Sequence, residues 1–270
     1  MPEGPSIVLL REAAARFRNR TVRAASGSTR VDLAPLVGRR VKAVRSWGKH
    51  FILEFSRTSL RIHLLMFGSY RIDARKDGPP RVSLHFDNGE LNFYACSVKQ
   101  IDVPLDDVYD WRVDVMNDAW DPKLARRTLK TRPDVLVCDA LLDQTVFSGV
   151  GNIIKNEVLF RIRVHPASRV GDLPARKLGE LIKQAREYSF DFLRWKRAGE
   201  LKRHWRVHTR RVCPCCGGAV TKLYLGTTRR RTFFCSTCQV DYSAGRGPTG
   251  AGPTEAAPAP ARRRRREPAG

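Results

Sequence analysis

The stretch CPCCGGAVTKLYLGTTRRRTFFCSTC, residues 213–238, decides how the C-terminal part of the chain folds. Two Cys-x2-Cys pairs, separated by eighteen residues, contribute four cysteines: Cys213, Cys216, Cys235 and Cys238. Each pair can point two sulfur atoms at one ion, so two pairs complete a tetrahedral thiolate site. The spacing predicts one structural zinc ion whose four positions are all filled by protein, and therefore no catalysis at the metal.

Three further cysteines do not fit this pattern. Cys215 is a rival for Cys213 or Cys216, but it lies too close to both to form a Cys-x2-Cys turn. Cys96 and Cys138 lie in apolar strand and helix patterns, where a core position is expected. Seven cysteines without an export signal predict a reducing compartment rather than a disulfide scaffold.

Positive charge gathers between the two cysteine pairs. Lys222, Arg229, Arg230 and Arg231 accompany two short apolar runs, a pattern that predicts a two-stranded ribbon with a basic tip. A ribbon that is held by zinc at its base can carry cations to the phosphates of DNA. The alternative is a solvated surface loop.

The whole chain is strongly basic. Its 270 residues include 50 Lys+Arg against 27 Asp+Glu, a formal net charge of +23. This surplus favours binding to nucleic acid over the alternative of a merely basic surface. The 42% hydrophobic content predicts a globular core and excludes wholesale disorder. Because the sequence has no apolar run of about 18 residues and no signal-peptide pattern at its start, we expect a cytoplasmic protein without a membrane partner.

Composition and periodicity divide the chain into four segments. We expect a β-rich catalytic domain over residues 1–120, a helical domain over residues 121–208 and a zinc finger over residues 209–242. Residues 243–270 are almost entirely Gly, Pro, Ala, Thr and Arg, a composition that predicts a disordered basic tail. The predicted fold class is α+β.

The first of these domains combines one helix with several strands. Pro5 suits the first turn of a helix that extends to about Arg18. Alternating apolar residues on both sides of the segment 87–90, which contains an Asn-Gly pair, predict a β-hairpin. Further strands are expected between about Val41 and Val103, so the domain is predicted to be a sandwich of antiparallel sheets with a leading helix.

The pattern becomes helical from about Asp121. The main predicted helices cover residues 135–147, 152–160 and 175–195, and the segment Gly149-Val150-Gly151 separates the first two.

Four motifs follow one another along the sequence: Pro2-Glu3-Gly4-Pro5, Gly48-Lys49 between two predicted strands, Gly149-Val150-Gly151-Asn152, and the four-cysteine finger. In this order they resemble the formamidopyrimidine-DNA glycosylase/endonuclease VIII family of base-excision repair enzymes. The resemblance covers residues 2 to about 239. It implies a helix-two-turn-helix in the second domain, damaged double-stranded DNA as partner, and a bifunctional DNA glycosylase and AP lyase that acts as a monomer.

The resemblance also implies the catalytic residues. Removal of Met1 would leave Pro2 with a free α-amine, whose pKa of about 8 makes a nucleophilic neutral fraction available at neutral pH. By resemblance, this amine attacks C1′ of the damaged nucleotide and forms a Schiff base. Glu3 matches the general acid/base of the family, and Lys49 matches its catalytic lysine, with roles in phosphate contact and lesion processing.

The same resemblance implies residues that hold DNA. Asn152 matches the asparagine of the helix-two-turn-helix, where the glycines before it would let N–H groups at a helix N-terminus approach a phosphate. Arg230 matches the finger arginine that grips phosphates beside the lesion. By resemblance, Leu65, Met66 and Phe67 fill the gap left by the flipped nucleotide; the alternative is that they are core residues at the end of a strand.

Two branches of the family differ in substrate. The formamidopyrimidine branch carries an Asp-Pro-Arg-Arg-Phe-Gly segment, which the stretch 91–102 lacks. This absence favours the endonuclease VIII branch and oxidised pyrimidines over 8-oxoguanine. Alternatives from other classes are a non-catalytic zinc-ribbon DNA-binding protein and an RNA-binding or ribosome-associated zinc protein. For an enzyme of this family we expect a location at the bacterial nucleoid.

Overall fold

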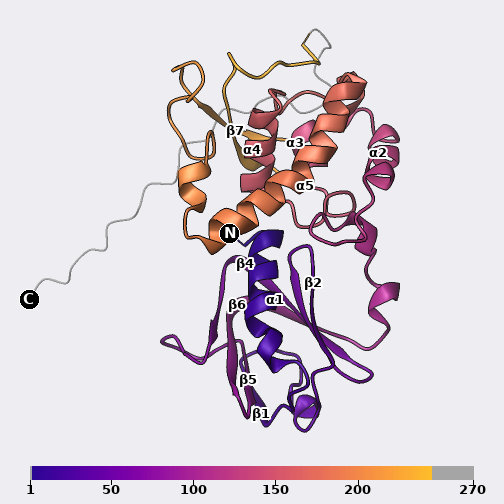
Figure 1. Ribbon diagram of the computed structural model, residues 1–270, viewed down its shortest axis with the longest axis vertical. Helices are drawn as coiled ribbons and strands as arrows, with labels where there is room; N and C mark the ends of the chain where they lie inside the picture. Colours follow the sequence, from indigo (N-terminus) through magenta and orange to yellow (C-terminus); the bar gives the residue numbers. More distant parts are fainter. Residues whose placement is uncertain (1, 245–270) are drawn as a thin grey trace, which may run out of the picture.

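The computed structural model describes residues 2–244, and the first half of these is built on an antiparallel sheet (Figure 1). Helix α1 (Gly4–Ala14), extended by a 3-10 turn at Ala15–Phe17, packs against strands of this sheet. Its apolar face is fully buried, as the sequence predicted. The six strands lie in the order β1-β5-β6-β4-β3-β2. Their bounds are β1 (Ala24–Ser26), β2 (Ala43–Trp47), β3 (His50–Glu54), β4 (Ser59–Ile72), β5 (Val82–Phe86) and β6 (Gly89–Ile101).

The antiparallel β domain with its leading helix is confirmed, and its strands are hydrogen-bonded into one continuous sheet. Strands β4 and β6 are long and pair with each other, except that the register shifts between Leu64 and Ser69. The predicted hairpin is present, because Phe86 pairs with Gly89 and leaves a two-residue turn. Apolar side chains are buried on both faces of the sheet, so the sheet has a packed hydrophobic cluster on each side.

The second half of the described chain is helical. Its α-helices are α2 (Pro122–Lys130), α3 (Val137–Ala140), α4 (Asn152–Arg161) and α5 (Ala175–Arg197). Helix α4 packs between α5 and the finger, and its residues 153–160 are all buried. Short 3-10 helices lie at Ala34–Leu36, Leu105–Asp107, Trp111–Val113, Val170–Asp172 and Leu201–His204.

The predicted helix over residues 135–147 is wrong for most of its length, since only Val137–Ala140 is α-helical. The Asp143 carboxylate accepts hydrogen bonds from the backbone N–H and the hydroxyl of Thr145. Such a local turn offers the backbone an alternative to helix. By contrast, the helices predicted over 152–160 and 175–195 are confirmed to within two residues.

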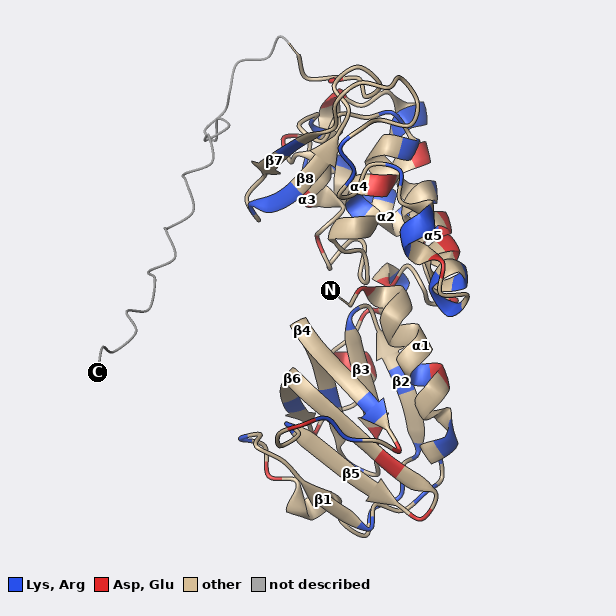
Figure 2. Cartoon of the chain, turned by 90° about the vertical axis from the view of Figure 1, so that its left-hand side faces the viewer, with Lys and Arg blue, Asp and Glu red and all other residues tan. Residues whose placement is uncertain are grey.

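The finger ribbon, strands β7 (Thr221–Leu225) and β8 (Arg230–Phe234), is antiparallel as predicted. Figure 2 shows the N-terminus and this ribbon on one side of the molecule and α5 on the other. Within residues 2–244, no helix is both long and apolar enough to cross a membrane. The predicted tail falls almost entirely outside the described residues, although Ser243 at its start donates a hydrogen bond to Asp172.

Candidate functional site

The site begins where the chain start meets the N-terminus of α4. Glu3 is completely buried, and its carboxylate accepts hydrogen bonds from the backbone N–H groups of Ile153 (2.7 Å) and Ile154 (3.2 Å). A helix N-terminus has unpaired N–H groups and a positive end, both of which suit an anion. We had expected these N–H groups to face a DNA phosphate; the structure gives them to Glu3 instead.

Glycines permit this close approach between segments far apart in sequence. A Cβ at Gly151 would lie 2.4 Å from the carboxyl carbon of Glu3, and a Cβ at Gly4 would lie 2.8 Å from the Cα of Gly149. Gly48 has φ +51°, and a Cβ there would overlap Ser148. We call this meeting point of Glu3–Gly4, Gly48–Lys49 and Gly149–Asn152 the junction.

Lys49 enters the junction from the turn between β2 and β3. The carboxylate of Asp114, which is 2% exposed, accepts from Gly48 N–H (3.0 Å) and so fixes this turn. Burial lowers the pKa of Lys49, Glu3 opposes that shift, and Arg230 adds to it. Burial likewise raises the pKa of Glu3, against the opposing charge of Lys49. The structure thus brings Glu3, Lys49 and Arg230 within electrostatic reach of one another.

Pro2 lies at the rim of a cleft of about 640 Å³, between α1 and the register shift of β4. Met66 and Phe67 line the same cleft. Leu65, Met66 and Phe67 are 47%, 50% and 85% exposed, so they are not core residues at a strand end. A row of exposed apolar side chains beside the predicted nucleophile is available for contact with a ligand.

The finger cysteines form the thiol cluster that their spacing predicted. The sulfur atoms of Cys213, Cys216, Cys235 and Cys238 all lie within 4.8 Å of one another. The Cys213–Cys238 and Cys216–Cys235 sulfur separations of 3.7 and 3.5 Å fit a tetrahedral ion with Zn–S bonds of about 2.3 Å. Cys215 lies outside the cluster and is exposed, whereas Cys96 and Cys138 are buried as expected.

The finger ribbon docks on α4 through polar side chains. Asn152 donates from Nδ2 to the carbonyl oxygen of Arg231 (2.9 Å), and Lys155 donates from Nζ to the hydroxyl of Thr232 (2.8 Å). Asn152 is thereby placed between the junction and the finger, while Arg230 stays exposed at the start of β8. Sequence reasoning missed Lys155 and Asp114, although a lysine inside the apolar segment 153–160 was a signal.

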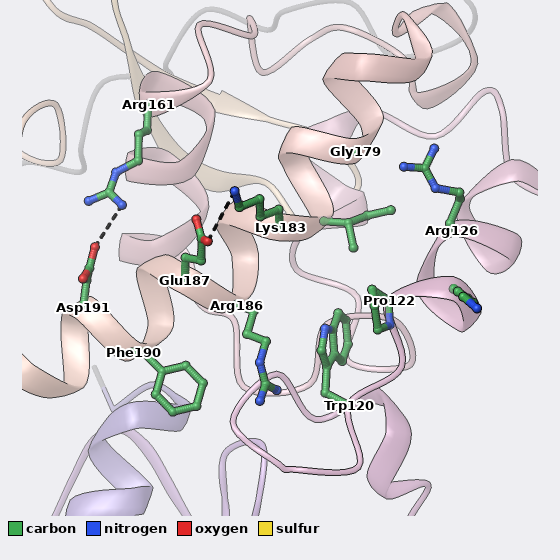
Figure 3. A pocket seen from close by; sticks show the side chains of 12 residues that line it. Trp120, Pro122, Arg126, Arg161, Gly179, Lys183, Arg186, Glu187, Phe190 and Asp191 are labelled. Carbon is green, nitrogen blue, oxygen red and sulfur yellow. Dashed lines mark hydrogen bonds and ion pairs between the residues drawn. The ribbon is translucent and has the colours of Figure 1, made fainter.

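A cavity larger than the cleft at Pro2 lies elsewhere. It measures about 920 Å³ and lies between α2 and α5, where Figure 3 shows Trp120, Phe190 and Arg186 around it. Pro2, Glu3 and Lys49 do not line it. Size alone therefore does not locate the chemistry in this fold.

Two family models match the chain: the formamidopyrimidine-DNA glycosylase N-terminal domain over residues 1–96 and the formamidopyrimidine-DNA glycosylase H2TH domain over residues 113–188. A relative that matches over most of both chains supports the same family. DNA-(apurinic or apyrimidinic site) lyase Nei2 of Mycolicibacterium smegmatis is 30% identical, over 77% of this chain and 85% of that protein. The chain belongs to the formamidopyrimidine-DNA glycosylase/endonuclease VIII family.

A longer relative and a solved structure also match the chain. Endonuclease 8-like 3 of Xenopus laevis is 32% identical over 82% of this chain, but the match spans only 38% of that longer protein. A solved structure of Lactococcus lactis formamidopyrimidine-DNA glycosylase, bound non-covalently to DNA containing an AP site, superposes with a TM-score of 0.77. It covers 88% of this chain and 99% of that one at 22% identity, which confirms the predicted α+β fold.

Proposed function

We propose that the protein is a bifunctional DNA glycosylase and AP lyase of base excision repair. The observation that carries this proposal is the buried carboxylate of Glu3, next in sequence to Pro2, which itself lines a cleft together with the exposed Met66 and Phe67. Burial raises the pKa of this carboxyl, which suits it to hold and donate a proton beside the N-terminal amine. The names of the relatives, an endonuclease 8-like protein and an AP lyase, support the same conclusion.

The reaction begins at the amine that Pro2 exposes once Met1 is removed. The neutral amine attacks C1′ of a flipped nucleotide, the bond from C1′ to the base breaks, and the base leaves with the bonding electrons. The amine gives up its proton to the departing base, the bond from C1′ to the ring oxygen breaks, and the nitrogen lone pair forms the C=N bond of an iminium ion. Because burial raises the pKa of Glu3, its carboxyl holds a proton at higher pH than usual and can donate it to the departing sugar ring oxygen.

Strand cleavage follows from the iminium ion. The iminium acidifies the C2′ proton, a base removes that proton, and the 3′ phosphate leaves by β-elimination. A second, δ-elimination releases the 5′ phosphate. Lys49 and Arg230 supply positive charge for the phosphates beside the lesion, and Leu65, Met66 and Phe67 fill the gap in the duplex.

Zinc has a structural role in this proposal. The four finger thiols, Cys213, Cys216, Cys235 and Cys238, would hold one zinc ion and so fix the base of the ribbon that carries Arg230. All four positions of the ion would be filled by sulfur, so it stabilises the finger.

Borohydride trapping tests the proposed mechanism. Protein with Met1 removed should form a covalent adduct with a duplex containing an abasic site, because borohydride reduces the iminium ion. Acetylation of the Pro2 amine should abolish the adduct, whereas Pro2→Gly should keep a primary amine and lose most of the rate. Absence of an adduct with the processed wild-type protein would rule out the Schiff-base mechanism.

We further propose oxidised pyrimidines, such as thymine glycol and dihydrouracil, as the substrates. Residues 91–101, which correspond to the arginine-bearing segment of the formamidopyrimidine branch, are absorbed into β6 and contain no arginine. The branches are distinguished by comparing the nicking rate on a duplex that contains thymine glycol with the rate on a duplex that contains 8-oxoguanine paired to cytosine. Faster cleavage of the 8-oxoguanine duplex would reverse this assignment.

The remaining proposals concern the setting of the reaction. We propose that the protein acts as a monomer on damaged double-stranded DNA, in the cytoplasm at the bacterial nucleoid. Light scattering of the protein with and without a duplex checks the monomer, and two copies per duplex would contradict it.

A further inference from the structure

Lys155 is a buried cation for which the proposed chemistry has no use. It lies on α4, is 1% exposed, and makes no ion pair with any carboxylate in the described part of the chain. Burial lowers its pKa to about 8, with Cys138, Asp139 and Glu3 opposing the shift and Arg230 adding to it. A buried cation is expensive, and an apolar residue would fill the space at lower cost. Packing alone therefore does not explain a lysine at this position.

The contacts of Lys155 lead to the finger arginine. Its Nζ donates to the hydroxyl of Thr232 at 2.8 Å, and the same hydroxyl donates to the carbonyl oxygen of Arg230 at 3.0 Å. Thr232 is itself 1% exposed. Lys155 thus reaches the backbone of Arg230 through one buried hydroxyl, in a place that excludes competing water.

The same N-terminal turn of α4 that carries Lys155 also contacts the catalytic carboxylate. Glu3 binds the N–H groups of Ile153 and Ile154, which lie two residues and one residue before Lys155 on the helix. The backbone groups that bind Glu3 and the side chain that binds Thr232 therefore lie within the same turn of helix. Among residues 2–244, Lys155 is the one charged side chain of α4 that hydrogen-bonds β8, beside the uncharged Asn152 and Asn156.

We infer that Lys155, acting through Thr232, is a positioning residue that fixes the phosphate-binding Arg230 relative to Glu3. The helix carries the alignment from the reaction centre to the finger, and the ammonium group holds the ribbon strand in register. This inference rests on the proposed function, because Arg230 is assigned there to a phosphate beside the lesion. Lys155 would thus affect the affinity for DNA without contacting the substrate.

A matched pair of substitutions at Thr232 tests the inference. Thr232→Val keeps the shape and removes the hydroxyl, whereas Thr232→Ser keeps the hydroxyl. Binding is measured with a duplex carrying a tetrahydrofuran abasic-site analogue, which cannot form an iminium ion, and chemistry with the single-turnover trapping rate at saturating abasic DNA. We expect Thr232→Val to weaken binding about tenfold, and Thr232→Ser to bind as the wild type does. The trapping rate at saturation should change less than threefold in both.

Lys155→Met extends the test to the cation itself. It should weaken binding by the same factor as Thr232→Val, and the double variant should be no weaker than either single variant, because both break one link. Zinc content and the unfolding temperature of each variant establish that the finger is intact. If Lys155→Met does not fold, the Thr232 pair still decides.

The outcomes separate this inference from the proposed function. Equal binding by Thr232→Val, Thr232→Ser and the wild-type protein, while the wild type still gives a trapped adduct, would overturn the role of Lys155 and leave the enzyme assignment standing. A loss in Thr232→Val that Thr232→Ser shares would also overturn it, because the hydroxyl would not matter. A wild-type protein that forms no adduct would instead refute the proposed function.

Discussion

The junction and the finger ribbon hold their charged groups in opposite ways. At the junction, Glu3 has no exposed surface and is held by two backbone N–H groups at fixed distances. On the ribbon, Arg230 and Arg231 are exposed. The junction is built by glycines that bring backbones together, whereas the ribbon is built on a cluster of thiols.

This difference separates two tasks. Acid-base chemistry requires a group whose pKa and position are set by its surroundings, which burial provides. Phosphate contact requires cations that remain available to a large, charged partner, which exposure provides. A change at Glu3 should therefore alter the rate with little effect on affinity, and changes in the finger should do the reverse.

The largest expected effect is that of Glu3→Gln. The amide keeps the size of the side chain but cannot donate or accept the proton, so the single-turnover trapping rate should fall by about 10²- to 10⁴-fold. Affinity for the tetrahydrofuran duplex should stay within about threefold of wild type, since no phosphate contact is removed. Glu12→Gln is the matched control, because Glu12 lies on α1, the helix that follows Glu3, and its side chain makes only an exposed pair with Arg197. A large loss of affinity in Glu3→Gln would show that the two tasks are not separate.

A smaller effect, on affinity, is expected from Cys235→Ser. This change removes one of the four clustered thiols, so zinc should be lost and the ribbon should lose its base. Affinity for the duplex should fall about a hundredfold at physiological salt, because several phosphate contacts go together. The matched control is Cys215→Ser, an exposed cysteine outside the cluster. Zinc retention by Cys235→Ser would contradict the ligand assignment.

The sequence predicted the local elements of the junction and the finger better than the long-range contacts that join them. The cysteine cluster follows from local spacing, and the helix over 152–160 follows from its apolar residues. The bond between Glu3 and the N-terminus of α4 joins residues 150 positions apart, and no local pattern reports such a contact. The hydrogen bond from Lys155 to Thr232 escaped notice for the same reason, because Thr232 lies on the finger. The failed helix over 135–147 shows the opposite case, in which a local Asp143 turn outweighed the apolar pattern.

The smallest effect, and the sharpest test of the exposed side, is expected from Arg230→Ala. Removing one phosphate contact should weaken duplex binding about tenfold and reduce the magnitude of the salt slope, log K against log[salt], by about one. Arg231→Ala is the matched control, because neighbouring residues of a strand point to opposite faces. Its carbonyl bond to Asn152 does not involve the side chain, so docking of the ribbon is preserved. If both variants reduce the salt slope equally, the ribbon contributes a diffuse positive field; if only Arg230→Ala does, a single cation is held in place, as the contact through Thr232 requires.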